Sequence, residues 1–156
     1  MRINREFTHE ILNILELPLS KRKFDAFVGE FCTEDDFGNP QLDLERILPM
    51  PETVKLPAKW KYENWGCKYD PYETFIDRTN RTIYFKTMWT SPHKAMRILA
   101  LKTKVSMIHS WCGEVDGYNV GKIAYHGNGR VIYRIPTWNS DSAYAMSRET
   151  RKQFSA

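Results

Sequence analysis

Residues 42–70 read LDLERILPMPETVKLPAKWKYENWGCKYD, and this stretch separates the two halves of the chain. Pro49 and Pro51 each lack a backbone N–H and have a fixed φ, which excludes a helix or a central strand at these positions. The sequence therefore predicts an irregular crossover here, with three apolar side chains that fill the core: Leu44, Ile47 and Leu48.

The end of this stretch, ENWGCKY, is rich in aromatic residues and contains a glycine where a tight backbone is expected. Its motif residues Asn64, Trp65 and Gly66 allow two interpretations. In one, the polar side chains bind a ligand beside an aromatic wall. In the other, Trp65 packs in the core while Glu63 and Asn64 bind backbone groups of the irregular segment. We favour the second interpretation, because the polar groups of such a segment must be hydrogen-bonded somewhere.

The segment before the crossover contains one ambiguous element, one helix and one loop. Residues 7–17 (FTHEILNILEL) fit either a helical stripe or a half-buried strand. Residues 34–41 (EDDFGNPQ) have the composition of a loop. Ser20 is a suitable N-cap for a helix over residues 21–32, which has four apolar residues on one face: Phe24, Phe27, Val28 and Phe31.

The segment after the crossover alternates strands with one helix. Ser91 and Pro92 mark the start of that helix, which is expected to run to about Thr103. Asn128 and Gly129 suit the primed turn of a hairpin. The predicted strands cover residues 73–77, 82–89, 105–115, 120–125 and 130–135, and residues 141–154 form a short polar helix or a partly ordered tail.

This order of elements is the split βαβ signature of a ferredoxin-like fold. We therefore predict a single α+β domain over residues 1–156, with residues 137–156 as a polar helix or tail. The antiparallel sheet carries two main helices on one face, and a C-terminal hairpin extends it. The name describes topology only, since no cluster-binding cysteine pattern is present.

Composition and charge narrow the class of protein. Cys32, Cys67 and Cys112 are odd in number and far apart, which is typical of a reducing compartment and gives no zinc framework. No apolar run is long enough to span a bilayer, so we expect a cytoplasmic protein without membrane contact. Residues 1–52 contain 11 acidic and 6 basic side chains, and residues 53–156 contain 8 and 17. The basic part can attract phosphates or an acidic partner, although solvated surface charge is the simpler interpretation.

The sequence offers no catalytic or metal-binding constellation. It lacks the GxSxG, HExxH, P-loop and dinucleotide-binding motifs. Cys112 and His109 lie three residues apart on a predicted strand and so point to opposite faces. The histidines His93, His109 and His126 fall on different elements. We therefore expect no catalytic residues, no metal and no cofactor.

Two binding surfaces remain as alternatives. Lys94, Arg97 and Lys104 share one helix face, and with Lys86 and Arg134 they could contact a macromolecule. Alternatively, the open sheet could bind single-stranded RNA or DNA, as RNA-recognition domains do. Residues that alternate on its strands would make those contacts: Tyr84, Lys86, Met88, Tyr133 and Arg134.

Four strings along the chain resemble a known family: LDLERILPMPE, ENWGCKYD, FKTMWTSPHKAMRILA and HSWCGEVDGYNVGKIAY. They are similar to the ferredoxin-like domain of YubB-like proteins, small proteins encoded by phages, prophages and plasmids. The resemblance covers residues 7–133. It implies that the ambiguous first segment is a strand, and it carries no established activity.

Together these observations predict a non-enzymatic accessory protein of a phage or plasmid that binds a host macromolecule. The expected partner is a host protein or a ribonucleoprotein complex, for example a defence system such as CRISPR that the protein would inhibit. Single-stranded nucleic acid is the alternative partner. The sequence leaves the oligomeric state open.

Overall fold

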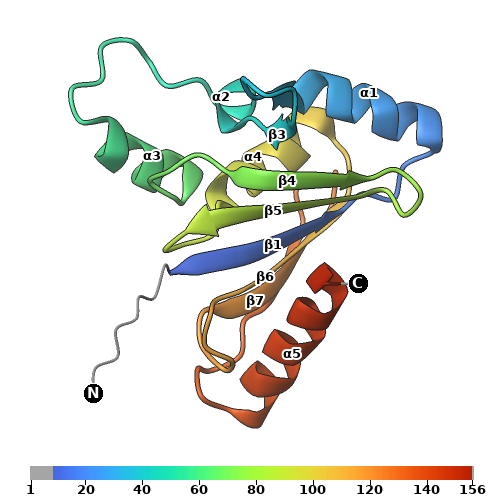
Figure 1. The fold of residues 1–156 in the computed structure, drawn as a ribbon, viewed down its shortest axis with the longest axis vertical. Helices are drawn as coiled ribbons and strands as arrows, with labels where there is room; N and C mark the ends of the chain where they lie inside the picture. Colours follow the sequence, from blue (N-terminus) through green and yellow to red (C-terminus); the bar gives the residue numbers. More distant parts are fainter. Residues whose placement is uncertain (1–8, 156) are drawn as a thin grey trace.

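The computed structural model describes residues 9–155, which form one six-stranded sheet with helices on both faces (Figure 1). Residues 7 and 8 of the predicted first element lie outside the described residues. The strands are β1 (Glu10–Glu16), β2 (Cys32–Glu34), β3 (Pro40–Leu42), β4 (Tyr72–Asp77), β5 (Thr82–Met88), β6 (Met107–Cys112), β7 (Val120–Tyr125) and β8 (Val131–Arg134). The helices are α1 (Lys21–Phe31), α2 (Leu44–Ile47), α3 (Pro57–Trp65), α4 (His93–Thr103) and α5 (Asp141–Ser155).

The large sheet has the strand order β4-β5-β1-β6-β7-β8, and all its neighbouring strands are antiparallel. Its first four strands, together with α1 and α4, have the order and topology of a ferredoxin-like unit. β7 and β8 extend the sheet beyond β6 as the predicted hairpin. The prediction of a ferredoxin-like α+β fold is therefore confirmed, including the strand over residues 10–16.

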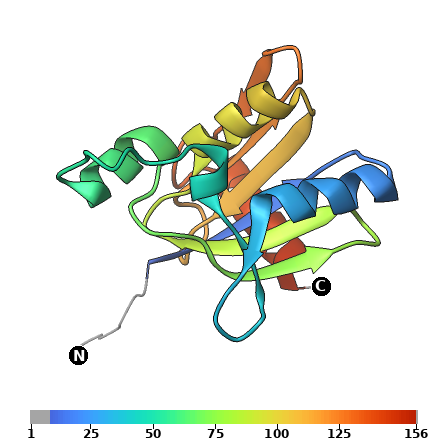
Figure 2. The same ribbon diagram turned by 90° about the horizontal axis from the view of Figure 1, so that it is seen from above.

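The two faces of the sheet bury different side chains, because successive residues of a strand point to opposite sides. On one face, Ile11 and Leu15 of β1 pack with the apolar sides of α1 and α4, as the helical spacing predicts. On the other face, Cys112 and Val120 pack with Ala143 of α5. In the view from above, α1 and α4 lie in front of the sheet and α5 lies behind it (Figure 2).

The predicted irregular crossover contains more regular structure than its prolines suggested. Leu44 and Ile47 are buried as expected, but they belong to the single-turn helix α2. The segment that follows Pro51 contains the helix α3, which the sequence analysis missed. Pro57 occupies its first turn and Gly66 ends it with a left-handed φ of 97°, the usual placement of proline and glycine at helix ends.

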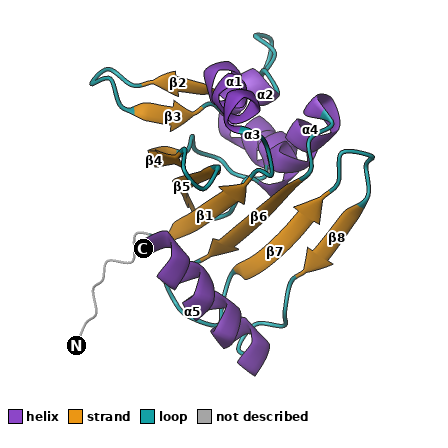
Figure 3. Cartoon of the chain, turned by 90° about the vertical axis from the view of Figure 1, so that its right-hand side faces the viewer, coloured by secondary structure: helices purple, strands orange, loops and turns teal. Residues whose placement is uncertain are grey.

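Three further boundaries differ from the sequence predictions. The predicted loop over residues 34–41 is the tip of a short hairpin, because β2 and β3 pair on both sides of it. The helix α4 begins at His93 without a side-chain cap, so Ser91 is not its N-cap. β6 is confined to residues 107–112, shorter than the predicted 105–115. Figure 3 shows the hairpin of β2 and β3 beside α1, next to β4 at the edge of the large sheet, where the Leu42 N–H donates to the Thr74 hydroxyl at 3.2 Å.

Candidate functional site

The motif Asn64, Trp65, Gly66 forms the C-terminal end of α3 and is a structural anchor. Trp65 is 1% exposed, and its indole N–H donates to the carbonyl oxygen of Leu48 at 2.9 Å. The Asn64 amide donates to the carbonyl oxygen of Trp60 at 2.9 Å. Trp65 therefore has the predicted packing role, and Asn64 binds a backbone group as predicted, although that group belongs to its own helix α3. The predicted contact of the Glu63 side chain is not among the hydrogen bonds within residues 9–155.

Gly66 fixes the contact between the end of α3 and the start of α4. A Cβ atom at this position would lie 3.0 Å from the carbonyl oxygen of Ser91 and 3.3 Å from the backbone nitrogen of His93. Its own carbonyl oxygen accepts a hydrogen bond of 2.6 Å from the Thr90 hydroxyl. The absence of a side chain therefore allows the two segments to approach closely.

Two of the predicted basic contacts, Lys94 and Arg97, line one groove between α4 and β8. This α4–β8 groove has a volume of about 340 Å³ and is lined by His93, Lys94, Arg97, Trp111, Ile123, Tyr125, Tyr133 and Ile135. No acidic side chain belongs to this lining within residues 9–155. Among the described contacts, Arg97 has neither an ion pair nor a side-chain hydrogen bond, and Lys94 donates only to the carbonyl oxygen of Glu63. The groove thus combines exposed positive charge with aromatic surface.

The other two predicted contacts lie on the opposite face of the sheet. Lys86 forms ion pairs with Glu73 at 3.1 Å and with Glu10 at 3.8 Å. Arg134 is opposite Lys122 in the pairing of β7 with β8, so it points away from the α4–β8 groove. The structure therefore brings Lys94 and Arg97 together but places Lys86 and Arg134 on the other face of the sheet. The sequence does not show which residues of different strands and helices lie on the same face of the folded sheet.

The sheet face proposed for nucleic acid is partly covered by α5. Tyr84 lies on this face, and its ring contacts Phe154 of α5 edge-on at 5.5 Å between centroids. Arg151 of α5 donates to the carboxylate of Asp116 at 2.9 Å and to the carbonyl oxygen of Gly113 at 2.6 Å. The centre of this face is therefore not an open platform, whereas Phe75 near its β4 edge stays exposed.

His109, Cys67 and Cys112 are buried inside the protein. His109 stacks against Phe85 of the main core cluster, whereas Cys112 belongs to the cluster on the opposite face of the sheet, as their spacing predicts. Burial raises the pKa of the Cys67 thiol to about 12 and that of Cys112 to about 11. Burial, and to a smaller extent the charge of His93, lowers the pKa of His109 to about 3. The described residues contain no group of three or more side chains able to hold a metal ion.

A buried chain of hydrogen bonds leads from His109 to the end of β5. The His109 Nε2–H donates to Asn13 Oδ1 at 2.9 Å, and the Asn13 amide donates to the Thr87 hydroxyl at 3.0 Å. The Thr87 hydroxyl donates to the carbonyl oxygen of Thr90 at 2.8 Å, and the Thr90 hydroxyl donates to Gly66. This series of hydrogen bonds fixes the loop between β5 and α4. No motif in the sequence indicated these hydrogen bonds, because the residues that make them are far apart along the polypeptide.

None of the helices within residues 9–155 combines the length and the apolar character needed to cross a membrane.

Comparison with known families found a match. A model described as the ferredoxin-like domain in Api92-like protein matches residues 68–154, more than half of the chain, from β4 to all but the last residue of α5. Comparison with curated proteins found no match, and comparison with solved structures found none. The chain belongs to the family of ferredoxin-like domains in Api92-like proteins.

Proposed function

We propose that the chain is a non-enzymatic protein that binds a macromolecular partner through the α4–β8 groove. The observation that carries this proposal is the combination of Lys94 and Arg97 with exposed apolar surface in one groove. Tyr133 and Ile135 are 56% and 52% exposed beside these cations. Exposed aromatic and basic side chains gathered in one place are typical of protein interfaces.

The edge of the sheet supports a protein as the partner. β8 is the last strand of the large sheet and pairs only with β7 in the described structure. The outer edge of such a strand can bind an extended segment of another protein through backbone hydrogen bonds. Because Lys94 and Arg97 lie beside this edge, the segment should carry acidic side chains.

The partner that we propose is a protein or ribonucleoprotein complex of a bacterial host. We propose further that the chain is an accessory protein of YubB-like type from a phage or plasmid, acting in the host cytoplasm. Inhibition of a host defence complex such as CRISPR is one such role. The support is the similarity of the four sequence strings to that family, together with a sequence that contains none of the catalytic motifs sought above.

Arg97→Glu tests the proposal, with Arg22→Glu as its matched control. Both residues are exposed arginines on helices, and Arg22 lies on α1, away from the groove. Affinity purification from a bacterial lysate, with quantification of bound proteins, should recover a stoichiometric partner. Arg97→Glu should lower the amount of bound partner by about 10-fold, because a repulsive charge then faces the acidic segment. Arg22→Glu should keep that partner. Equal retention by both variants would contradict the role of the groove.

A further inference from the structure

A second groove, between α3 and the end of β5, contains exposed aromatic side chains. Tyr62 of α3, Tyr69 after α3 and Trp89 after β5 are 47%, 51% and 50% exposed. They line a groove of about 670 Å³, the α3–β5 groove, whose other lining residues are Ala58, Lys59, Lys68 and Thr90. Three large aromatic side chains that remain half exposed in one concave site indicate a ligand with a flat surface.

The charged side chains of this groove are all positive. Lys59 and Lys68 are exposed, and within the described part of the chain neither forms an ion pair or a side-chain hydrogen bond. The neighbouring Lys61 differs, because it is paired with Asp70 at 3.7 Å and lies over the Trp65 ring. No acidic residue is part of the described lining. The groove is therefore suited to a ligand that is both aromatic and anionic.

Trp89 is held in a backbone conformation that is rare for a bulky residue. Its φ is 70°, in the left-handed region. Its N–H donates to the carbonyl oxygen of His9 at 2.8 Å, and its carbonyl oxygen accepts from the Asn119 amide at 3.1 Å. The indole also stacks on the imidazole of His9, with 3.7 Å between ring centroids. Such outliers persist where surrounding contacts determine them, and they cluster at binding sites.

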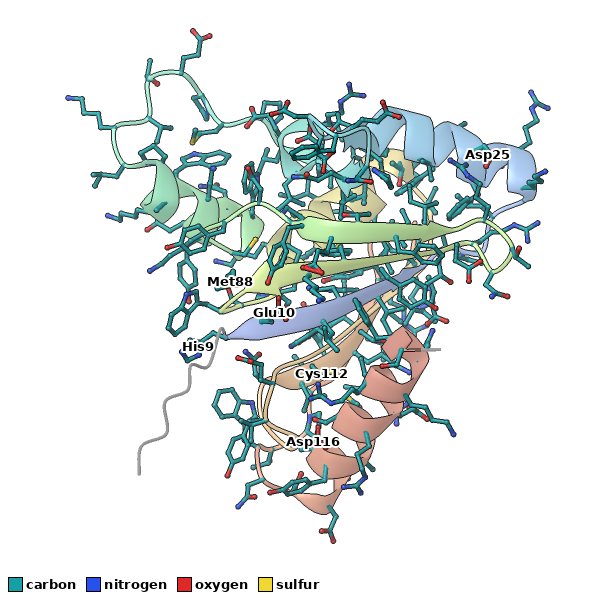
Figure 4. All side chains as sticks on the ribbon, in the orientation of Figure 1. His9, Glu10, Asp25, Met88, Cys112 and Asp116 are labelled. Atoms are coloured by element: carbon teal, nitrogen blue, oxygen red, sulfur yellow. The ribbon has the colours of Figure 1, made fainter. Side chains whose placement is uncertain are left out.

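The position of this residue at the end of the sheet is visible in Figure 4. His9 and Met88 lie together where β1 begins and β5 ends, and Trp89 follows Met88 directly. The buried hydrogen bonds from Asn13 through Thr87 to Thr90 fix the loop immediately after Trp89. The aromatic side chain is thus placed by contacts on both sides of it.

We propose that the α3–β5 groove binds single-stranded nucleic acid. Unpaired bases stack on tyrosine and tryptophan rings regardless of sequence, and lysines contact the phosphates between them. A protein segment would use the same aromatic surface, but it would not explain why the charged residues that line the groove are all positive. The site is separate from the α4–β8 groove, and the two share no lining residue. The proposal therefore does not depend on the proposed function.

Fluorescence anisotropy with a labelled 12-nucleotide strand of mixed sequence, as RNA and as DNA, tests this site. The full chain should bind at least one of the two strands at 50 mM salt. Trp89→Ala should weaken binding by about 10-fold, because one stacking ring is lost. Trp138→Ala is the matched control, since Trp138 is an equally exposed tryptophan outside the groove, and it should leave binding unchanged.

A second variant covers the case in which Trp89→Ala disturbs folding. Lys59→Gln combined with Lys68→Gln changes only exposed side chains, and it should weaken binding and reduce the salt dependence. For two phosphate contacts the slope of log K against log salt should change by about 1.4. Trp89→Phe keeps a stacking ring and should restore most of the affinity.

Any of the following results would overturn the proposal. They are no saturable binding of either strand at 50 mM salt, equal affinity of Trp89→Ala and the unchanged chain, and binding of a polyglutamate peptide in place of the oligonucleotides. Arg97→Glu should leave oligonucleotide affinity unchanged. Loss of oligonucleotide binding in that variant would assign it to the α4–β8 groove and would also contradict the proposal.

Discussion

At the scale of single residues, the most unusual feature is the neutral His109 inside the core. It is fully buried, packs beside Phe85 and Trp111, and bonds through Nε2 to Asn13. Its Nδ1 atom has no hydrogen-bond partner among the described residues. A proton on that atom would be a buried charge without compensation, which explains the direction of its pKa shift. Sequence alone did not identify this histidine as buried, because its partners come from other strands.

This environment predicts a specific dependence of stability on pH. In the unfolded chain a histidine has a pKa near 6.5, whereas the pKa of His109 in the folded protein is about 3. The contribution of His109 to the free energy of unfolding is therefore fully present above pH 6.5. It falls as the pH is lowered toward 3, since in this range only the unfolded chain binds the proton. Between pH 7 and pH 5 this contribution amounts to about 2 kcal/mol. Urea unfolding of the unchanged chain and of His109→Gln should show the difference between their free energies of unfolding shrinking by about that amount. A difference that stays constant with pH would contradict the assignment.

At the scale of secondary-structure elements, the sequence predicted the elements that carry a clear periodicity. The amphipathic helix α1 and the hairpin of β7 and β8 were found because their apolar and turn residues repeat at fixed spacing. The helix α3 was missed because it has little amphipathic character, and only Trp65 of its residues is fully buried. The only sequence signals of this helix are local: Pro57 in its first turn and Gly66 directly after its last residue.

The role of Gly66 at the end of α3 can be tested against Gly38. Both glycines have a positive φ, 97° and 82°, but a Cβ at Gly38 would meet nothing within 4 Å. Gly38→Ala should therefore lower the free energy of unfolding by about 1 kcal/mol, the cost of the left-handed conformation alone. Gly66→Ala adds the approach to Ser91 and should lower it by at least about 1 kcal/mol more. Urea unfolding measures both values, and equal losses would show that α3 and α4 can move apart freely.

At the scale of the whole molecule, α5 covers the sheet face opposite α1 and α4. The sequence indicated a polar C-terminal helix or tail, and the helix is confirmed as Asp141–Ser155. Its packing was not predictable from composition, because its buried residues are small, namely Ala143, Ser147 and Thr150. Polar contacts position it: Ser147 accepts a hydrogen bond from the Gly117 N–H at 3.0 Å, and Arg151 binds the loop after β6. Because α5 covers the centre of this face, the sheet surface considered for nucleic-acid binding is not open there.

Because α5 packs through few large apolar side chains, it should open more readily than the main core. Cys112 reports this opening, since it is fully buried beneath α5, close to Asp116 (Figure 4). Arg151→Ala removes the bonds to Asp116 and to the Gly113 carbonyl oxygen, and should speed alkylation of Cys112 by about 10-fold. Cys67 is an internal control, because it is equally buried in the cluster on the opposite face and should react as slowly as before. Mass spectrometry after timed exposure to a maleimide measures both rates in the same sample. If Cys67 accelerated as much as Cys112, the variant would be loosening the entire fold, and α5 would not be a separate opening unit.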